Sequence, residues 1–220
     1  NVCDVIKQIE ANDSQERLEG LGVEVIRGRA RFVDDTTVSV DDANYTAGNF
    51  VIATGSRAAV PPIDGLDAKR VYTNENIFNL REKPEHLIII GGGPIGTEMA
   101  QAHARLGVHV SLIDMQHILP RDDAELGAIV REQLKHDGVT FYEQAGVERL
   151  QHRDDGVVVN IDHNDQSKRV EGTHLLVAAG RKANIDDMGL EAAGVQTHRH
   201  GIQVDKRLRT SNKRVYAAGD

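Results

Sequence analysis

The chain has 220 residues, a formal net charge of −8 at pH 7, 40% hydrophobic residues and 27% charged residues. The acidic balance argues against nucleic acid or an anionic membrane as a partner. No apolar run approaches the roughly 20 residues that a membrane-spanning helix needs, so we expect a cytoplasmic protein that does not enter a membrane. The single cysteine, Cys3, excludes an internal disulfide and a cysteine-based zinc site.

The first 60 residues are predicted to form an amphipathic helix and a short second helix, followed by an antiparallel β-meander. The acidic pairs Asp34-Asp35 and Asp41-Asp42 fit the turns of such a meander. The proline- and glycine-containing stretch 61–82 is predicted to be a crossover linker. Because the chain starts on Asn1 and stops on a strand running into a turn, we expect it to be part of something larger.

A glycine-rich turn follows the most apolar stretch of the chain. Leu87–Ile90 is predicted to be a strand buried on both faces of a parallel sheet. Gly91, Gly93 and Gly96 then match G-x-G-x-x-G, in which the glycines permit a tight turn, approach of a pyrophosphate, and close packing of helix on strand. A helix is predicted from Ile95, and its N-terminus would form an anion site.

An acidic residue ends the next predicted strand. Asp114 follows the third glycine at close to the spacing of roughly 20 residues expected for a carboxylate that bonds an adenosine ribose. This carboxylate would repel a 2′-phosphate, and no Arg or Lys occurs in Met115–His117 to pair with one. The sequence therefore favours NAD(H) over NADP(H).

The remaining elements complete an α/β pattern. A helix is predicted over about 122–136, and further strands are predicted over 139–144, 146–152, 156–162 and 173–180. The fold class is predicted to be a Rossmann-like, three-layer α/β domain with a β-meander. The chain has ten histidines, and His198 and His200 are their tightest pair. We interpret that pair as an exposed hairpin and predict no metal site.

Four separated motifs together resemble one family. They are FVIATGS (50–56), IIIGGGPIGTEMA (88–100), LLVAAGRKAN (175–184) and GIQVDKRLRTSNKRVYAAGD (201–220). In order and spacing they are similar to the FAD- and NAD(P)-dependent pyridine nucleotide-disulfide oxidoreductases, in particular to the dihydrolipoamide dehydrogenase and mercuric reductase-like members. The resemblance covers essentially the whole chain.

The resemblance implies domains and site residues. It implies the C-terminal part of an incomplete FAD-binding domain over 1–60, an NAD(H)-binding domain over 83–204, and a return segment to the FAD domain over 205–220. Glu98 matches a glutamate near the nicotinamide, although its position fits a solvated helix carboxylate equally well, and Arg181 fits a surface ion pair as well as a cofactor contact. The implied NAD contacts are Gly91, Gly93, Pro94, Ile95, Gly96, Glu98, Asp114, Gly180 and Arg181, and the implied FAD contacts are Ala53, Thr54, Gly55, Gly219 and Asp220.

The resemblance also implies a reaction. In the parent enzyme, hydride would pass between NAD(H) and FAD, and electrons would pass to or from a cysteine pair. The FAD glycine motif, the redox disulfide and the dimerisation domain would lie outside this chain, so we expect the chain alone to be inactive, to hold no catalytic residue unless Glu98 is one, and to come from a homodimer. Two alternatives stay open: a related flavoprotein without a redox disulfide, similar to a soluble transhydrogenase, and a non-catalytic, stand-alone nucleotide-binding module.

Overall fold

The computed structural model describes residues 2–10, 12 and 14–219, without the side chains of Val2 and Cys3. The side chain of Cys3 and the FAD contact expected of Asp220 therefore lie outside the described residues. No helix among the described residues is long and apolar enough to cross a membrane.

The chain forms two compact units. One is Ala58–Arg181, and the other combines Asn1–Arg57 with Lys182–Asp220. The chain passes from one unit to the other along β5 (Ser56–Ala58) and β13 (Arg181–Ala183). This division assigns no cofactor to either unit, so the functional domain ranges given above stay predictions.

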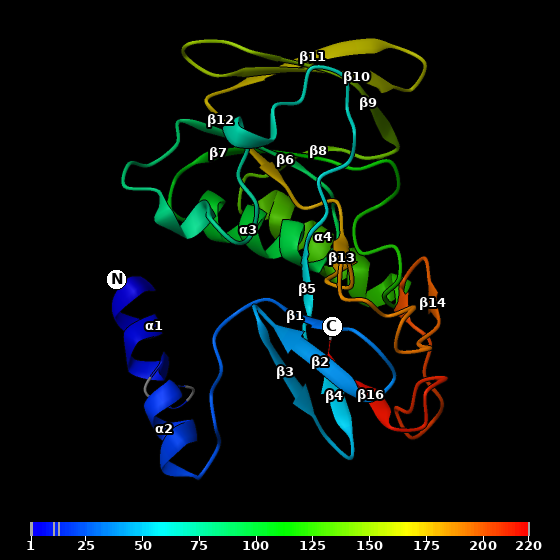
Figure 1. Cartoon of the computed structure of the whole chain (residues 1–220). Helices are drawn as coiled ribbons and strands as arrows, with labels where there is room; N and C mark the ends of the chain where they lie inside the picture. Colours follow the sequence, from blue (N-terminus) through cyan, green and yellow to red (C-terminus); the bar gives the residue numbers. More distant parts are fainter. Residues whose placement is uncertain (1, 11, 13, 220) are drawn as a thin grey trace. The chain divides into compact units, whose positions relative to one another are not determined.

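A parallel sheet forms the middle of the unit Ala58–Arg181. Its strand order is β12-β6-β7-β8, and all neighbours in the sheet run parallel (Figure 1). The strands are β6 (His86–Ile90), β7 (His109–Ile113), β8 (Thr140–Tyr142) and β12 (His174–Val177). The apolar run of β6 is buried on both faces, as predicted for a strand covered on both sides.

Two helices cover one face of this sheet. They are α3 (Pro94–Arg105) and α4 (Ala124–His136). Side chains of alternate residues of β6 and β7 pack with Ala100 of α3 and Leu134 of α4 in one buried cluster. The predicted start of the first helix at Ile95 lies one residue inside the observed helix, which Pro94 opens.

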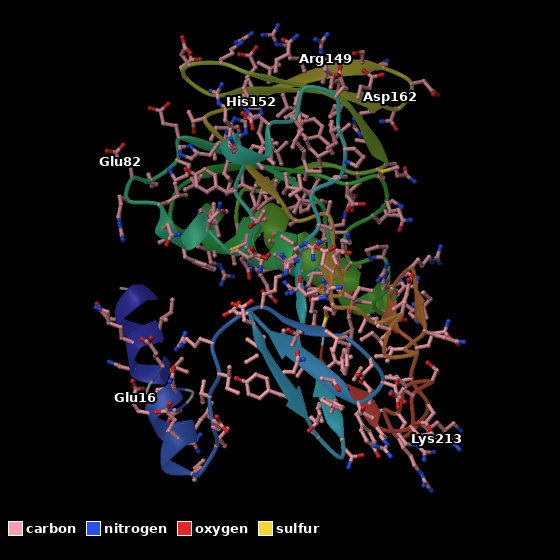
Figure 2. The ribbon with its side chains drawn as sticks, viewed as in Figure 1. Glu16, Glu82, Arg149, His152, Asp162 and Lys213 are labelled. Atoms are coloured by element: carbon pink, nitrogen blue, oxygen red, sulfur yellow. The ribbon has the colours of Figure 1, made fainter. Side chains whose placement is uncertain are left out.

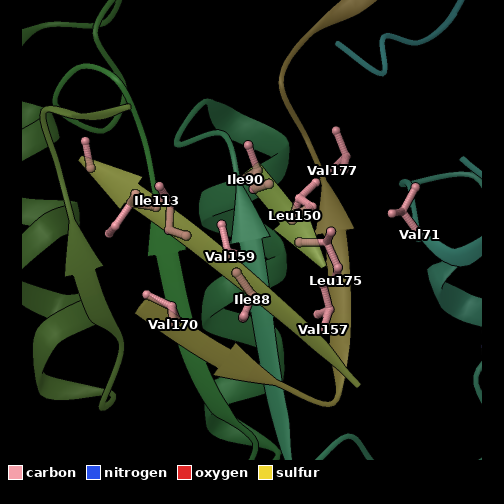
Figure 3. Close-up of a cluster of buried hydrophobic side chains, with 12 residues drawn as sticks. Val71, Ile88, Ile90, Ile113, Leu150, Val157, Val159, Val170, Leu175 and Val177 are labelled. Atoms are coloured by element: carbon pink, nitrogen blue, oxygen red, sulfur yellow. The ribbon is translucent and has the colours of Figure 1, made fainter. Parts of the chain in front are cut away.

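An antiparallel sheet covers the other face. Its order is β11-β10-β9, formed by β9 (Ala145–His152), β10 (Val157–His163) and β11 (Ser167–Gly172). Ile88 and Ile90 of β6 pack against Val157 and Val159 of β10 (Figure 3). The unit therefore has the predicted three layers: helices, parallel sheet and meander. The short 3-10 turns Ala68–Arg70 and Ile77–Asn79 lie within the stretch predicted as a linker.

The second unit contains the predicted N-terminal helices, α1 (Val2–Glu10) and α2 (Gln15–Gly20), and the predicted antiparallel meander. The meander consists of β1 (Ala30–Phe32), β2 (Thr37–Val40) and β3 (Ala43–Thr46). The next strand, β4 (Phe50–Ile52), pairs instead in parallel with β16 (Val215–Ala217), which corrects the expectation that it continues the meander. A pairing between segments so distant in the sequence leaves no local signal.

The histidine-containing hairpin also lies in this unit. It is formed by β14 (Thr197–His198) and β15 (Gly201–Ile202). His198 and His200 are exposed, as predicted, and their rings meet edge to face with centroids 5.8 Å apart. In the described part of the chain, no group of three or more His, Cys, Asp or Glu side chains is arranged to hold a metal ion.

Three histidines of the unit Ala58–Arg181 make its stability depend on pH. Burial lowers the pKa of His86, and the neighbouring ring of His109, 4.0 Å away between centroids, lowers it further. Burial also lowers the pKa values of His174 and of His152, the latter with a contribution from the charge of Arg70. In the unfolded chain these histidines have the ordinary pKa of 6.5, so below about pH 6.5 the unfolded chain binds more protons than the folded chain. The free energy of unfolding is therefore undiminished by these histidines above about pH 6.5 and decreases as the pH falls below it.

We therefore expect the thermal unfolding midpoint to drop by several degrees between pH 7.5 and pH 5.5. The variant His86→Gln, which can still bond the Ser111 hydroxyl 2.9 Å from His86 Nε2, is expected to show a smaller drop. The matched control is His136→Gln, at the exposed end of α4. Its unfolding midpoint should drop by the same amount as that of the unsubstituted chain. Equal drops in all three chains would contradict the role given to His86.

Candidate functional site

The glycine-rich turn joins β6 to α3 with very little space around its first and third glycines. Gly91 has φ +110°, and a Cβ there would lie 2.4 Å from the carbonyl oxygen of Ala178. A Cβ on Gly96 would lie 1.8 Å from the carbonyl oxygen of Gly91. Both distances are far inside van der Waals contact, so these glycines let the turn, the helix and β12 approach closely.

The middle glycine has a different environment. Gly93 is the N-cap of α3, and a Cβ added there would meet nothing within 4 Å. No side chain caps this end of the helix, and Pro94 stands at its start. Because the first-turn N–H groups of an α-helix lack intrahelical partners and carry the positive end of the helix dipole, this open end can accept an anionic group.

Asp114 lies beside the turn, as its place at the end of the neighbouring parallel strand predicts. Its Oδ2 accepts a hydrogen bond from the N–H of Gly92 at 2.6 Å, and its Oδ1 accepts one from the N–H of Gln116 at 2.6 Å. These bonds fix the carboxylate but leave further lone pairs, since a carboxylate offers about four acceptor positions. Those positions can accept hydroxyl groups of a ligand.

An open cavity of about 650 Å³ lies next to Asp114, between the loop that follows β7 and the helix α4. The sequence did not indicate it. Its lining includes Glu143, a buried carboxylate that accepts a hydrogen bond from the N–H of Ile118 and two from the guanidinium of Arg131. Burial raises the pKa of Glu143, but the Arg131 guanidinium and the Ile118 N–H outweigh burial, and the pKa is lowered on balance.

The other predicted NAD contacts lie in the same unit as the turn. Glu98 is exposed on α3. Gly180 has φ +127°, and its carbonyl oxygen accepts the N–H of Ala59 at 2.9 Å. Arg181 is exposed at the start of β13. Ligand contacts by these three residues stay predictions.

The predicted FAD contacts lie in the other unit, where β4 and β16 run parallel. Ala53 and Thr54 are exposed, and the hydroxyl of Thr54 donates to the carbonyl oxygen of Asn184 at 2.7 Å. A Cβ on Gly219 would lie 3.8 Å from the Cα of Gly55. The two predicted FAD segments, far apart in the sequence, therefore lie side by side.

The parallel sheet with helices on one face, together with the glycine turn at the end of β6, defines a Rossmann-like α/β protein. A family model described as pyridine nucleotide-disulphide oxidoreductase matches residues 4–220. The chain belongs to this family of oxidoreductases.

Curated relatives and solved structures agree with this family. The chain is 33% identical to a mercuric reductase of Streptomyces lividans over 98% of the chain and 47% of the relative. It is 37% identical to a dihydrolipoyl dehydrogenase of Geobacillus stearothermophilus, over 92% of the chain and 44% of the relative. The structure of the HOCl-induced flavoprotein disulfide reductase RclA from Escherichia coli is similar with a TM-score of 0.86 and 32% identity, over 95% of this chain and 48% of that one.

A second solved structure, LpdA from Mycobacterium tuberculosis, is similar with a TM-score of 0.85 and 30% identity, over 99% of this chain and 50% of that one. This chain thus spans about half the length of the relatives that it matches.

Proposed function

We propose that this chain is the NAD(H)-binding portion of a flavoprotein disulfide oxidoreductase, in which hydride passes between NAD(H) and FAD and electrons pass to or from a cysteine pair. The observation that carries this proposal is the open N-terminus of α3 at Gly93, next to the fixed carboxylate of Asp114. The names of the relatives, a mercuric reductase, a dihydrolipoyl dehydrogenase and a disulfide reductase, support the reaction class.

The residues at the turn suit the parts of a dinucleotide. The N–H groups at the start of α3 would hold the pyrophosphate, and the absence of a Cβ at Gly93 would let it approach the backbone. Asp114 would accept hydrogen bonds from the adenosine ribose. When bound, the nicotinamide ring would donate or accept the hydride, while the residues of this chain hold and orient the dinucleotide.

The FAD contacts form only part of a site. Gly55 and Gly219 would allow the backbone to approach the flavin cofactor closely, but this role would need further residues of the parent enzyme. A Cys-x-x-x-x-Cys pair in the full-length protein would distinguish the disulfide oxidoreductase from the transhydrogenase-like alternative. NADH binding without any flavin reaction in that protein would favour the stand-alone module.

We expect the chain to bind NADH at least about tenfold more tightly than NADPH. A 2′-phosphate would lose the ribose hydrogen bond and would bring negative charge close to the Asp114 carboxylate, each worth on the order of 1 kcal/mol or more. Calorimetric titration with both nucleotides measures the ratio, and Asp114→Ala should narrow it.

The control for this substitution removes the same charge elsewhere. Asp162 is exposed on β10, in the antiparallel sheet (Figure 2), and Asp162→Ala should keep the ratio of the unsubstituted chain. Equal affinities for the two nucleotides would refute the predicted selectivity. If Asp162→Ala narrowed the ratio of the two affinities as much as Asp114→Ala does, net charge rather than the position of Asp114 would set that ratio.

A further inference from the structure

Glu143 joins two elements that border the cavity. It lies between β8 and β9 and is only 8% exposed. Its Oε1 accepts the N–H of Ile118 at 3.0 Å, and its Oε2 accepts Arg131 Nε at 2.7 Å and a second hydrogen bond from the same guanidinium. The His117 ring lies 3.7 Å from Oε2. One carboxylate therefore ties α4 to the loop that follows Asp114.

The loop continues from Ile118 directly back to the glycine turn. The N–H of Leu119 donates to the carbonyl oxygen of Gly92 at 2.8 Å, and the N–H of Gly92 donates to Asp114 at 2.6 Å. A continuous path of backbone and hydrogen bonds thus runs from Glu143 through Ile118 and Leu119 to the turn.

The backbone of this loop does not hold its shape by local preference. Leu119 has φ +50°, a left-handed conformation that residues with a Cβ seldom adopt. Such a residue keeps its conformation only where surrounding contacts impose it. Here those contacts include the hydrogen bond of Leu119 to Gly92, the hydrogen bond from Asp122 N–H to the Leu119 carbonyl oxygen at 3.1 Å, and the burial of Ile118 in the core cluster. The hydrogen bond of Ile118 to Glu143 is the one that a side chain outside the loop supplies.

We propose that Glu143 is a positioning residue for dinucleotide binding: by holding Ile118 it keeps the loop against the glycine turn and keeps the Asp114 carboxylate directed at the ribose. This inference rests on the proposed function. Without Glu143 the loop samples other conformations. The apparent affinity for NADH then falls in proportion to the fraction of molecules whose loop still has the binding-competent conformation. The guanidinium of Arg131 holds Glu143 ionised and in place.

The test compares two glutamates of the 220-residue chain. Glu143→Ala is expected to weaken NADH binding about tenfold, since it removes a charge-assisted hydrogen bond to the loop. Glu148→Ala removes the same charge from an exposed position on β9 and should leave the NADH dissociation constant unchanged. Titration calorimetry gives the dissociation constants, and circular dichroism shows that each chain is folded at 25 °C.

A double-mutant cycle separates positioning from a general loss of structure. If Glu143 acts through Asp114, then Glu143→Ala should change the NADH dissociation constant less than twofold in a chain that already carries Asp114→Ala. Glu143→Gln keeps the size of the side chain but replaces one of the two accepting oxygens by an NH2 group, so that either the Ile118 N–H or the Arg131 guanidinium faces a donor. Glu143→Gln should weaken NADH binding about fivefold, and by less than twofold in a chain that already carries Asp114→Ala. It therefore provides the test if the alanine variant fails to fold.

Three results would overturn the inference. The first is an unchanged NADH affinity in both Glu143 variants. The second is a Glu143 substitution that raises the NADH dissociation constant by the same factor with and without Asp114→Ala. The third is a Glu143→Gln chain that is unfolded at 25 °C, which would make the role of Glu143 one of fold stability. Failure of the unsubstituted chain to bind NADH would instead contradict the proposed function, so the two failures are distinguishable.

Discussion

Gly96→Val is expected to destabilise the chain by about 3 kcal/mol and to abolish NADH binding. A Cβ at this position would lie 1.8 Å from the carbonyl oxygen of Gly91, which belongs to the backbone and cannot rotate away. The helix α3 would have to move off β6, and this movement would open the buried cluster that holds Ala100. Urea unfolding monitored by circular dichroism measures the loss.

The control is a glycine with space around it. Gly146, in β9, has nothing within 4 Å of an added Cβ, and valine is well suited to a strand. Gly146→Val should therefore leave the free energy of unfolding unchanged or slightly raised. If Gly96→Val were as stable as Gly146→Val, the close approach of α3 to the turn would be wrong.

Gly93→Val is expected to separate the two effects: a nearly unchanged fold together with a loss of NADH affinity of at least about thirtyfold. The added side chain meets no protein atom within 4 Å of its Cβ, and its cost to stability is about 1 kcal/mol, because valine is a poorer N-cap than glycine. In the proposed complex, however, the side chain would stand where the pyrophosphate approaches the backbone. Calorimetry of NADH binding and thermal unfolding of the same chain measure the two effects.

The contrast between these variants is specific to the proposed site. Both add the same side chain, three residues apart, yet Gly96→Val should lose NADH binding together with stability, whereas Gly93→Val should lose NADH binding with the fold nearly unchanged. A Gly93→Val chain that binds NADH as tightly as the unsubstituted chain would contradict the assignment of Gly93 to the pyrophosphate.

The sequence predicted the central layer of the unit Ala58–Arg181 well, because each of its features leaves a local signal. The apolar run Leu87–Ile90 indicates a strand covered on both faces, and helical spacing after the turn indicates α3. Asp114 could be assigned to the same ligand as the turn because it ends the next predicted strand, at close to the expected spacing from the third glycine. Its hydrogen bonds to Gly92 and Gln116 were not predictable from spacing.

Features that depend on distant or polar partners were missed. β11 (Ser167–Gly172) is mostly polar, and only Val170 is buried, so no alternation indicated a strand. Glu143 follows an apolar stretch and would ordinarily be expected on the surface. Its burial depends on Arg131, which lies 12 positions earlier and on a different element, and no pattern in the sequence joins the two.

An amide NMR titration of the 220-residue chain with NADH tests the central claim most directly, since it reports where the nucleotide binds. We predict that the largest chemical-shift changes fall on residues 91–97 and 114–119, that they saturate, and that in Gly93→Val they need a much higher NADH concentration to reach saturation. The amides around Asp162, in the antiparallel sheet, should not move. The absence of saturable changes at the glycine turn, or a cluster of changes elsewhere, would contradict the assignment of this chain as an NAD(H)-binding portion.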